Sequence, residues 1–180
     1  MPGQPAEYFG LNYSGDFIYS SAVPAFSERL LAAASPAEVW RFRAKPFSQA
    51  LSGNPDLAVR VEKARSRQLA RAALHQASLG TLDGPQRFAG FLIEMARETG
   101  VAAGPAIAIE LPLSRVEIAH YLALNADTLS RLMSRMKSDG LITQKSRHCI
   151  TLRDWKAVAA LCPIAPALLA IESSRPSPFR

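Results

Sequence analysis

Residues that build catalytic or metal sites are scarce in this chain of 180 residues. It has two cysteines, Cys149 and Cys162, which form no C-x-x-C pair, and three histidines. His75, His120 and His148 fall on different expected elements, so no metal-ligand spacing and no Ser-His-Asp or Cys-His order arises. A glycine-rich loop for holding phosphate is also missing. The sequence therefore argues against an enzyme and predicts no metal and no cofactor.

Long hydrophobic runs are missing as well. The chain has no run of about 18 apolar residues, so no membrane span is expected. The first residues, MPGQPAEYFG, lack the basic segment and apolar core of a secretory signal, which favours a cytoplasmic protein. In a reducing cytoplasm we expect both cysteines to be free thiols, with a disulfide or redox switch as the alternative.

Positive charge is present in excess and is unevenly distributed. The chain is 48% hydrophobic and 20% charged, an ordinary globular composition, and its formal charge is +6. Residues 111–160 hold eight Lys or Arg against four Asp or Glu, whereas residues 1–50 hold four of each. An acidic polymer is therefore a plausible partner for the C-terminal half.

Two short helices joined by a tight turn are predicted between residues 114 and 142. Ser114 and Glu117 form a capping-box pattern, after which Ile118, Ala119 and Leu122 share one helical face. Residues 123–125 make the turn, and Asn125 is a favoured cap for a second helix over residues 126–138.

The second of these helices has two chemically different sides. Its apolar side holds Leu129, Leu132, Met133 and Met136, and its polar side holds Asp127, Ser130, Arg131 and Ser134. A helix-turn-helix presents such a polar side to base edges in the major groove of DNA. The alternative is an ordinary helical hairpin whose polar side faces solvent.

Flanking patterns extend this unit. Asp83 and Gln86 begin a helix with a broad apolar face that Gly100 closes, and residues 107–111 alternate as a strand. Residues 141–144 and 148–152 read as a hairpin, or wing, whose Lys145 and Arg147 contact phosphate or simply face solvent. Residues 154–161 are expected to form a short helix, followed by a proline-rich tail that is loose beyond Glu172.

A long helix is expected from Asn54-Pro55 to Leu79, with Gly80 ending it. A narrow stripe at helical spacing predicts a seam that pairs with a partner helix or, alternatively, packs on its own domain. The stripe consists of Leu57, Val61, Ala64, Gln68, Ala72, His75 and Leu79, of which all but Leu79 are the expected dimerisation residues.

Short aromatic and β-branched runs in residues 1–50 suggest strands at 8–11, 17–19 and 39–42, with a possible helical turn at 28–34. The predicted fold class is thus mainly helical with small β elements. We expect a partial β domain over 1–50, a long helix over 51–80, a winged helix-turn-helix domain over 81–162 and a tail over 163–180.

A series of short motifs occurs in a specific order and spacing: Pro85-Gln86-Arg87-Phe88-Ala89, Phe91-Leu92, Leu111-Pro112-Leu113-Ser114-Arg115, Glu117-Ile118-Ala119, Tyr121-Leu122, Asp127-Thr128-Leu129-Ser130-Arg131 and Gly140-Leu141-Ile142. With these motifs, residues 83–161 resemble the DNA-binding domain of the Crp/Fnr superfamily of bacterial transcription regulators, in the subgroup of nitrogen-fixation and anaerobic regulators. Residues 46–79 resemble the long dimerisation helix of that family, and residues 7–45 only the last part of its β-roll sensor domain.

The resemblance implies a homodimer that reads an inverted repeat of double-stranded DNA with TTGA-type half-sites, and RNA polymerase as a further partner. Arg131 would donate to guanine, Asp127 would accept from cytosine and Ser130 would serve either base. The expected backbone contacts are Ser114, Arg115, Thr128, Arg135, Lys137, Lys145 and Arg147.

Some positions depart from the family pattern. The sensor roll is longer than residues 1–50, so a shortened roll is expected, through truncation, a misplaced gene start or loss of the sensor. Residues 20–22 lack the arginine and glutamate of cyclic-nucleotide binders, and no N-terminal cysteine group for an iron–sulfur cluster occurs. Ala123 stands where glycine is usual, and Asp127 where glutamate is usual. The alternative function is a truncated regulator that forms mixed dimers without its own tight DNA binding.

Overall fold

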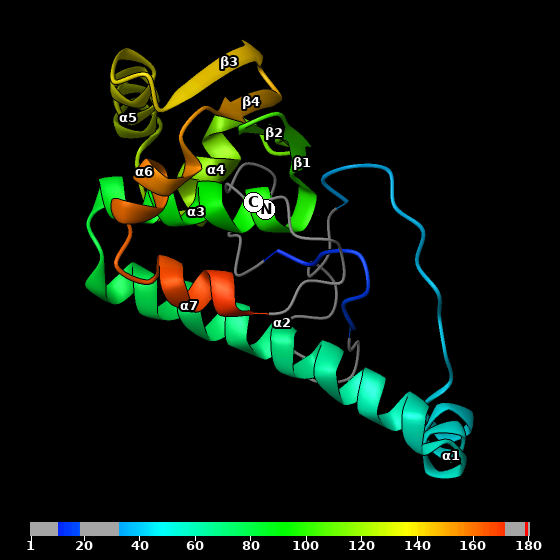
Figure 1. Cartoon of the computed structure of the whole chain (residues 1–180). Helices are drawn as coiled ribbons and strands as arrows, with labels where there is room; N and C mark the ends of the chain where they lie inside the picture. Colours follow the sequence, from blue (N-terminus) through cyan, green and yellow to red (C-terminus); the bar gives the residue numbers. More distant parts are fainter. Residues whose placement is uncertain (1–10, 19–32, 172–178, 180) are drawn as a thin grey trace, which may run out of the picture.

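The computed structural model describes residues 11–18, 33–171 and 179. Over these residues the chain is mainly helical, with one small antiparallel sheet (Figure 1). The elements are α1 (Ala44–Gly53), α2 (Pro55–Thr81), α3 (Gly84–Thr99), β1 (Val101–Ala103), β2 (Ala106–Glu110), α4 (Arg115–Tyr121), α5 (Ala126–Ser138), β3 (Ile142–Ser146), β4 (Cys149–Leu152), α6 (Trp155–Ala160) and α7 (Ala165–Ala170).

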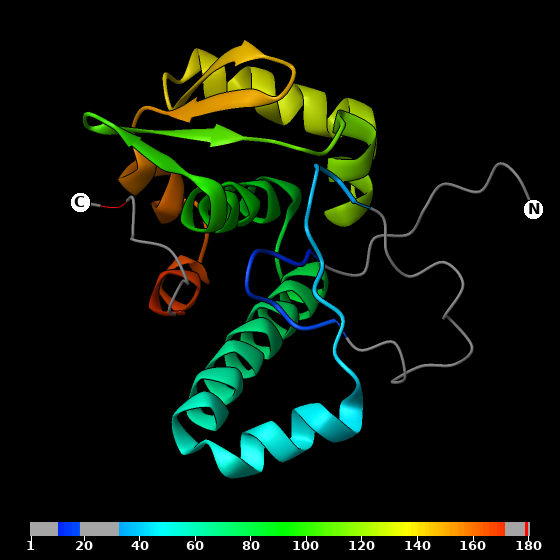
Figure 2. The ribbon, with the colours of Figure 1, turned by 90° about the vertical axis from the view of Figure 1, so that its right-hand side faces the viewer.

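The elements form layers. The sheet has the strand order β1-β2-β4-β3, and α3 lies beneath it (Figures 1 and 2). Helix α5 runs beside β3 on the side of the molecule opposite α2, and α7 lies between α3 and α2 (Figure 1). The core therefore sits between the sheet and α3, where alternating β2 residues Ile107 and Ile109 are each 1% exposed.

Helix α3 is the central element of the C-terminal domain. The helix begins at the expected place, where Asp83 and Gln86 form a capping box, and it closes at Gly100. Every residue from Phe88 to Glu98 is buried, because the sheet, α6 and α7 all pack on this helix. Its wide apolar face, with Phe88, Leu92 and Met95 at its centre, is the largest contribution to the core.

Helix α2 begins as expected, since the Asn54 side chain accepts a hydrogen bond from the Leu57 amide and Pro55 occupies the first turn. Its 27 residues correspond to about 40 Å. The expected stop at Gly80 is wrong by one residue, because the helix continues to Thr81 and the Leu82 amide bonds the Ser78 carbonyl. One helical glycine costs only about 1 kcal/mol relative to alanine, too little to end a long helix.

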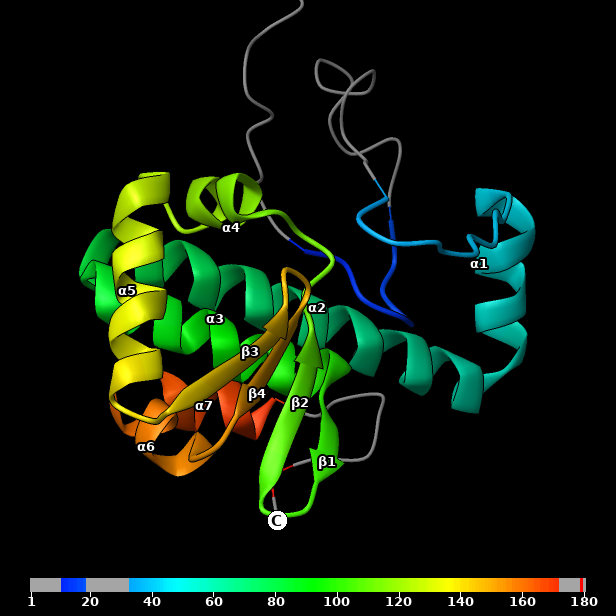
Figure 3. The same ribbon diagram turned by 90° about the horizontal axis from the view of Figure 1, so that it is seen from above.

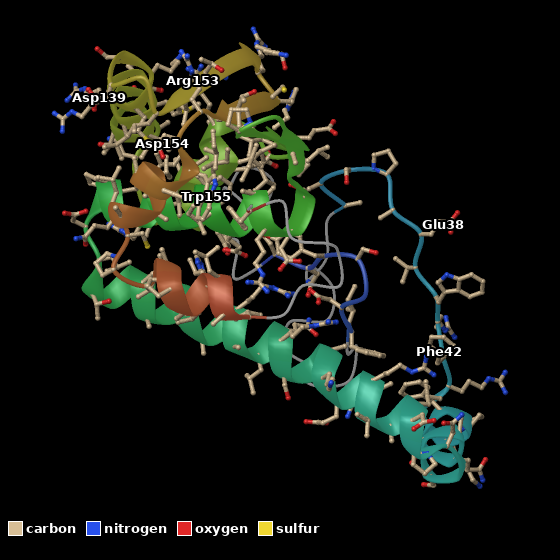
Figure 4. The ribbon with its side chains drawn as sticks, viewed as in Figure 1. Glu38, Phe42, Asp139, Arg153, Asp154 and Trp155 are labelled. Atoms are coloured by element: carbon tan, nitrogen blue, oxygen red, sulfur yellow. The ribbon has the colours of Figure 1, made fainter. Side chains whose placement is uncertain are left out.

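The strands predicted in residues 1–50 are not found where the structure describes this region. Residues 17 and 18 and residues 39–42 have no strand assignment, and the latter lie in a segment that runs apart from the sheet and α3. Figure 4 shows Glu38 and Phe42 on this segment. A strand needs a paired neighbour for its backbone groups, and among the described residues no strand pairs with either run. The remaining residues of the predicted runs, 8–10 and 19, and most of 28–34, fall outside the described residues.

Residues from Pro163 were predicted to be a tail, but residues 165–170 form α7 and belong to the C-terminal domain. Ala165 and Leu168 are 1% and 6% exposed, and Arg97 of α3 donates to the Leu168 carbonyl at 2.7 Å. The sequence prediction missed α7 because six residues provide little periodicity, and packing against α3 stabilises the helix instead. The expectation of a loose chain beyond Glu172 concerns residues outside those described.

Candidate nucleic-acid interface

Helix α4 is held at its start by the predicted capping box. The Glu117 amide donates to Ser114 Oγ at 3.3 Å, and the Ser114 amide donates to the Glu117 carboxylate at 2.7 Å. Ile118 and Ala119 are 2% and 1% exposed, so the apolar side of α4 packs inward. Ser114 and the neighbouring Arg115 remain exposed at the start of the helix.

Helix α5 is oriented by its apolar side. The Asn125 side chain caps it, accepting from the amides of Asp127 at 2.8 Å and Thr128 at 3.1 Å. Leu129, Met133 and Met136 are at most 5% exposed and pack toward α3 and α4. Because residues on opposite sides of a helix point in opposite directions, this packing turns the polar side of α5 to solvent.

The three predicted base-reading residues lie in the first two turns of α5. Asp127 and Arg131 are exposed, and Ser130 between them is half-buried. One turn separates Asp127 from Arg131, so the carboxylate, hydroxyl and guanidinium share one face near the start of the helix. Thr128, Arg135 and Lys137 on the same helix are also exposed.

The turn between the two helices has a left-handed residue. Ala123 has φ of 49°, the conformation that favours glycine, and its amide donates to the His120 carbonyl at 3.0 Å. Arg87 of α3 contacts this turn. Its Nη1 donates hydrogen bonds to the Leu122 carbonyl at 2.7 Å and to the Ala123 carbonyl at 3.4 Å. Sequence reasoning assigned Arg87 no role, because its partners are backbone oxygens 35 and 36 positions away.

The wing is a β-hairpin formed by β3 and β4. Lys145 and Arg147 are exposed at its tip, and an irregularity in the pairing separates Gln144 from Ser146. Lys137 of α5 donates to the Gln144 side chain at 3.2 Å, which links the wing to the end of α5. In Figure 3 the hairpin and α5 face the viewer side by side. The pairing of Lys137 with Gln144 was not predicted, because it depends on how β3 returns beside α5.

The residues predicted to mediate dimerisation differ in how far they are buried within this protomer. Val61, Ala64 and His75 are buried within this protomer, whereas Leu57 and Gln68 are half-buried and Ala72 is exposed. The His75 ring stacks on Tyr121 of α4, with ring centroids 4.0 Å apart. Burial of three of the six side chains agrees with packing on their own domain, the alternative left open by the pattern.

Among the described residues there is no disulfide, no cluster suited to a metal ion and no helix that could span a membrane. Cys149 and Cys162 are free thiols, as expected, and burial raises the pKa of Cys162. Within residues 11–18, 33–171 and 179, no cluster of His, Cys, Asp and Glu is arranged to hold a metal. None of the helices in those ranges has the length and apolarity needed to cross a membrane.

A capped helix-turn-helix followed by a paired β-hairpin on a helical base defines a winged helix-turn-helix domain. Residues 86–161 match the Crp-like helix-turn-helix domain family. This part of the chain is therefore a Crp-like helix-turn-helix domain.

Relatives of known name agree with this placement. The chain is 28% identical over 139 residues to the nitrogen fixation regulation protein FixK of Bradyrhizobium diazoefficiens, covering 77% of this chain and 54% of FixK. The structure of FixK2 from Bradyrhizobium japonicum superposes with a TM-score of 0.58 at 27% identity, covering 66% of this chain and 58% of that one. A CooA variant from Carboxydothermus hydrogenoformans gives a TM-score of 0.56 at 25% identity, over 64% and 53% of the two chains. The chain thus spans about half the length of the curated relatives it matches.

Proposed function

We propose that this protein is a sequence-specific DNA-binding transcription regulator that reads base edges through α5. The observation that carries the proposal is the exposed face of α5, where Asp127 and Arg131 point to solvent while Leu129 is fully buried on the other side. The names of the curated relatives, which include nitrogen fixation regulators and transcriptional activators, support the same class of function.

The charge around this face favours a polyanion. Arg131, Arg135 and Lys137 lie on α5, and Lys145 and Arg147 lie on the neighbouring wing. Phosphate contacts from the two elements would position the duplex, and the first turns of α5 would then read it. Ser114, Arg115 and Thr128 add hydroxyl and guanidinium donors at the starts of α4 and α5.

We further propose a homodimer that reads an inverted repeat, with α2 as its contact. The exposed side of α2 presents Val59 and Leu69, which are 56% and 71% exposed, together with Ala73 and Ala77. These residues share one face of the helix, opposite the side that carries Ala64 and His75. A second copy would pack on this face, placing two α5 helices about 34 Å apart, one turn of DNA.

Selection from random double-stranded DNA with the purified full chain tests this function. We expect an enriched inverted repeat with two half-sites spaced by about 10 base pairs. Enrichment of single half-sites would support DNA reading by a monomer and contradict the dimer. Failure to enrich any sequence, with binding to a full-length relative retained, would favour instead an interaction module that acts through mixed dimers.

A further inference from the structure

Residues 11–18 lie across the joint between α2 and the winged domain (Figures 1 and 2). Gln68 of α2 holds the backbone of this segment, accepting from the Phe17 amide at 3.2 Å and donating to the Phe17 carbonyl at 3.0 Å. The same amide group donates to the Asn12 side chain at 2.7 Å. Two side chains of the segment, Tyr13 and Asp16, then reach buried charges on α3 and α2.

Glu94 of α3 connects this segment to the helix-turn-helix. Its carboxylate accepts from the Tyr13 hydroxyl at 2.9 Å and from the Tyr121 hydroxyl at 3.3 Å. Tyr121 is the last residue of α4, and its ring stacks on His75 of α2. One buried carboxylate therefore contacts both the N-terminal segment and the first helix of the reading unit.

Arg71 makes the matching connection on the α2 side. It is 7% exposed, forms an ion pair with Asp16, and lies 3.6 Å from the Glu98 carboxylate of α3. Its guanidinium also sits over the Tyr13 ring, 5.1 Å from the centroid. Loss of one partner from such a buried group leaves a charge unpaired, which is costly.

Direct packing between α2 and the reading unit is sparse by comparison. Among the described elements, α2 packs extensively only on α1, whereas α3 packs on the sheet, α5, α6 and α7. A cavity of about 20 Å³ also lies at the joint, lined on one side by Leu74, His75 and Ser78 and on the other by Phe91 and Tyr121. Side-chain contacts such as the stacking of His75 on Tyr121 and the packing of Leu74 against the core join the two parts, and the polar contacts of residues 11–18 add to them.

We propose that residues 11–18 form a strap that fixes the orientation of the winged domain on α2, so that displacement of the strap controls DNA affinity. This inference rests on the proposed function. In a dimer joined through α2, the strap sets the spacing and tilt of the two α5 helices. A free joint would require both reading helices to be ordered on binding, which weakens the affinity.

The test uses the full chain with Tyr13→Phe combined with Asp16→Asn, which removes the Tyr13 hydroxyl and the charge of Asp16 with little change in shape. Glu38→Gln, at an exposed carboxylate away from the joint (Figure 4), is the matched control. Two measurements are made: fluorescence anisotropy with the duplex selected by the unmodified protein, and amide hydrogen exchange over residues 70–124. We expect about tenfold weaker DNA binding by the double variant, in line with loss of charge-assisted hydrogen bonds, and faster exchange in α3 and α4.

Tyr13→Phe alone keeps the ion pair and should give a smaller effect of the same sign. The strap proposal is overturned if the double variant keeps wild-type exchange and binds DNA within twofold of the unmodified protein. Hydrogen exchange is measured without DNA, so it tests the strap even if the unmodified protein binds no DNA. That outcome would refute only the proposed function.

Discussion

Arg131 is the residue on which the proposed base preference most depends. Its guanidinium presents a fork of donors that matches the O6 and N7 acceptors of guanine. We predict that Arg131→Ala lowers affinity for the selected site by about 1–3 kcal/mol, or roughly 5- to 150-fold, and relaxes the preference at one base pair. Arg135→Ala, on the same helix, is the control. Because Arg135 is proposed to contact a phosphate, its loss should weaken binding to all sequences equally, measured by gel-shift titration across single-base variants.

Ala123 carries backbone strain in the turn of the helix-turn-helix. Its φ of 49° lies in the left-handed region, where a Cβ atom costs about 1–2 kcal/mol. Ala123→Gly is therefore expected to raise the free energy of unfolding by about 1 kcal/mol, measured by urea denaturation. Ala73→Gly, in the exposed middle of α2, should lower it by about 0.5–1 kcal/mol. An equal loss of stability in both variants would mean that position 123 is not strained.

At the scale of elements, α2 has two faces with different roles. One face, with Ala64, Arg71 and His75, is buried within the protomer, and the other is exposed and carries Val59 and Leu69. The residues of the predicted seam lie on the first of these faces, where they range from buried Val61 to exposed Ala72. A stripe of alanines and polar residues does not indicate whether its own domain or a second copy will cover it. Only the positions of α1, Tyr121 and residues 11–18 decide that.

Leu69→Asp tests the exposed face of α2. We predict that it converts the proposed dimer to a monomer in sedimentation velocity, because a carboxylate would be buried in an apolar contact between copies. Val101→Asp is the control, since Val101 is 65% exposed and lies on β1, away from α2. A dimer that survives Leu69→Asp would place the contact elsewhere.

At the scale of the whole molecule, the buried carboxylate of Glu94 makes stability depend on pH. Burial raises its pKa to about 7 from an ordinary 4.5, although the hydroxyls of Tyr13 and Tyr121 and the charge of Arg71 oppose the rise. The folded state therefore binds more protons than the unfolded state between pH 4.5 and 7, so this contribution to stability falls as pH rises through that window. Burial also raises the pKa of Glu98, so its contribution to stability likewise falls as pH rises. Burial lowers the pKa of His75, so the contribution of His75 rises with pH.

Glu94→Gln isolates this contribution. We predict that the free energy of unfolding of the wild type, relative to the variant, decreases by about 3 kcal/mol between pH 4.5 and 8. Chemical denaturation at pH 5, 6, 7 and 8 measures the difference directly. Parallel pH profiles for the two proteins would show that Glu94 does not titrate between the folded and unfolded states in this range.

The helix-turn-helix could be predicted because its determinants are local. Ser114 with Glu117, and Asn125 ahead of Asp127, cap helices through bonds that span two or three residues. The apolar side of α5 follows from helical spacing, and its burial left Asp127 and Arg131 exposed as the pattern predicted. Arg87, in contrast, caps α4 from a distant helix, and no local pattern marks it.

The sequence by itself determined where most of the helices begin and end, which side of α5 is polar, and the family to which the winged domain belongs, because caps and helical periodicity act within a few residues. Tertiary structure alone decided that residues 39–42 form no strand, that α7 packs on α3, and that Tyr13 and Asp16 reach Glu94 and Arg71. Each of these depends on which distant surface is available to bury a side chain or pair a backbone group, and that is set only when the whole chain has folded.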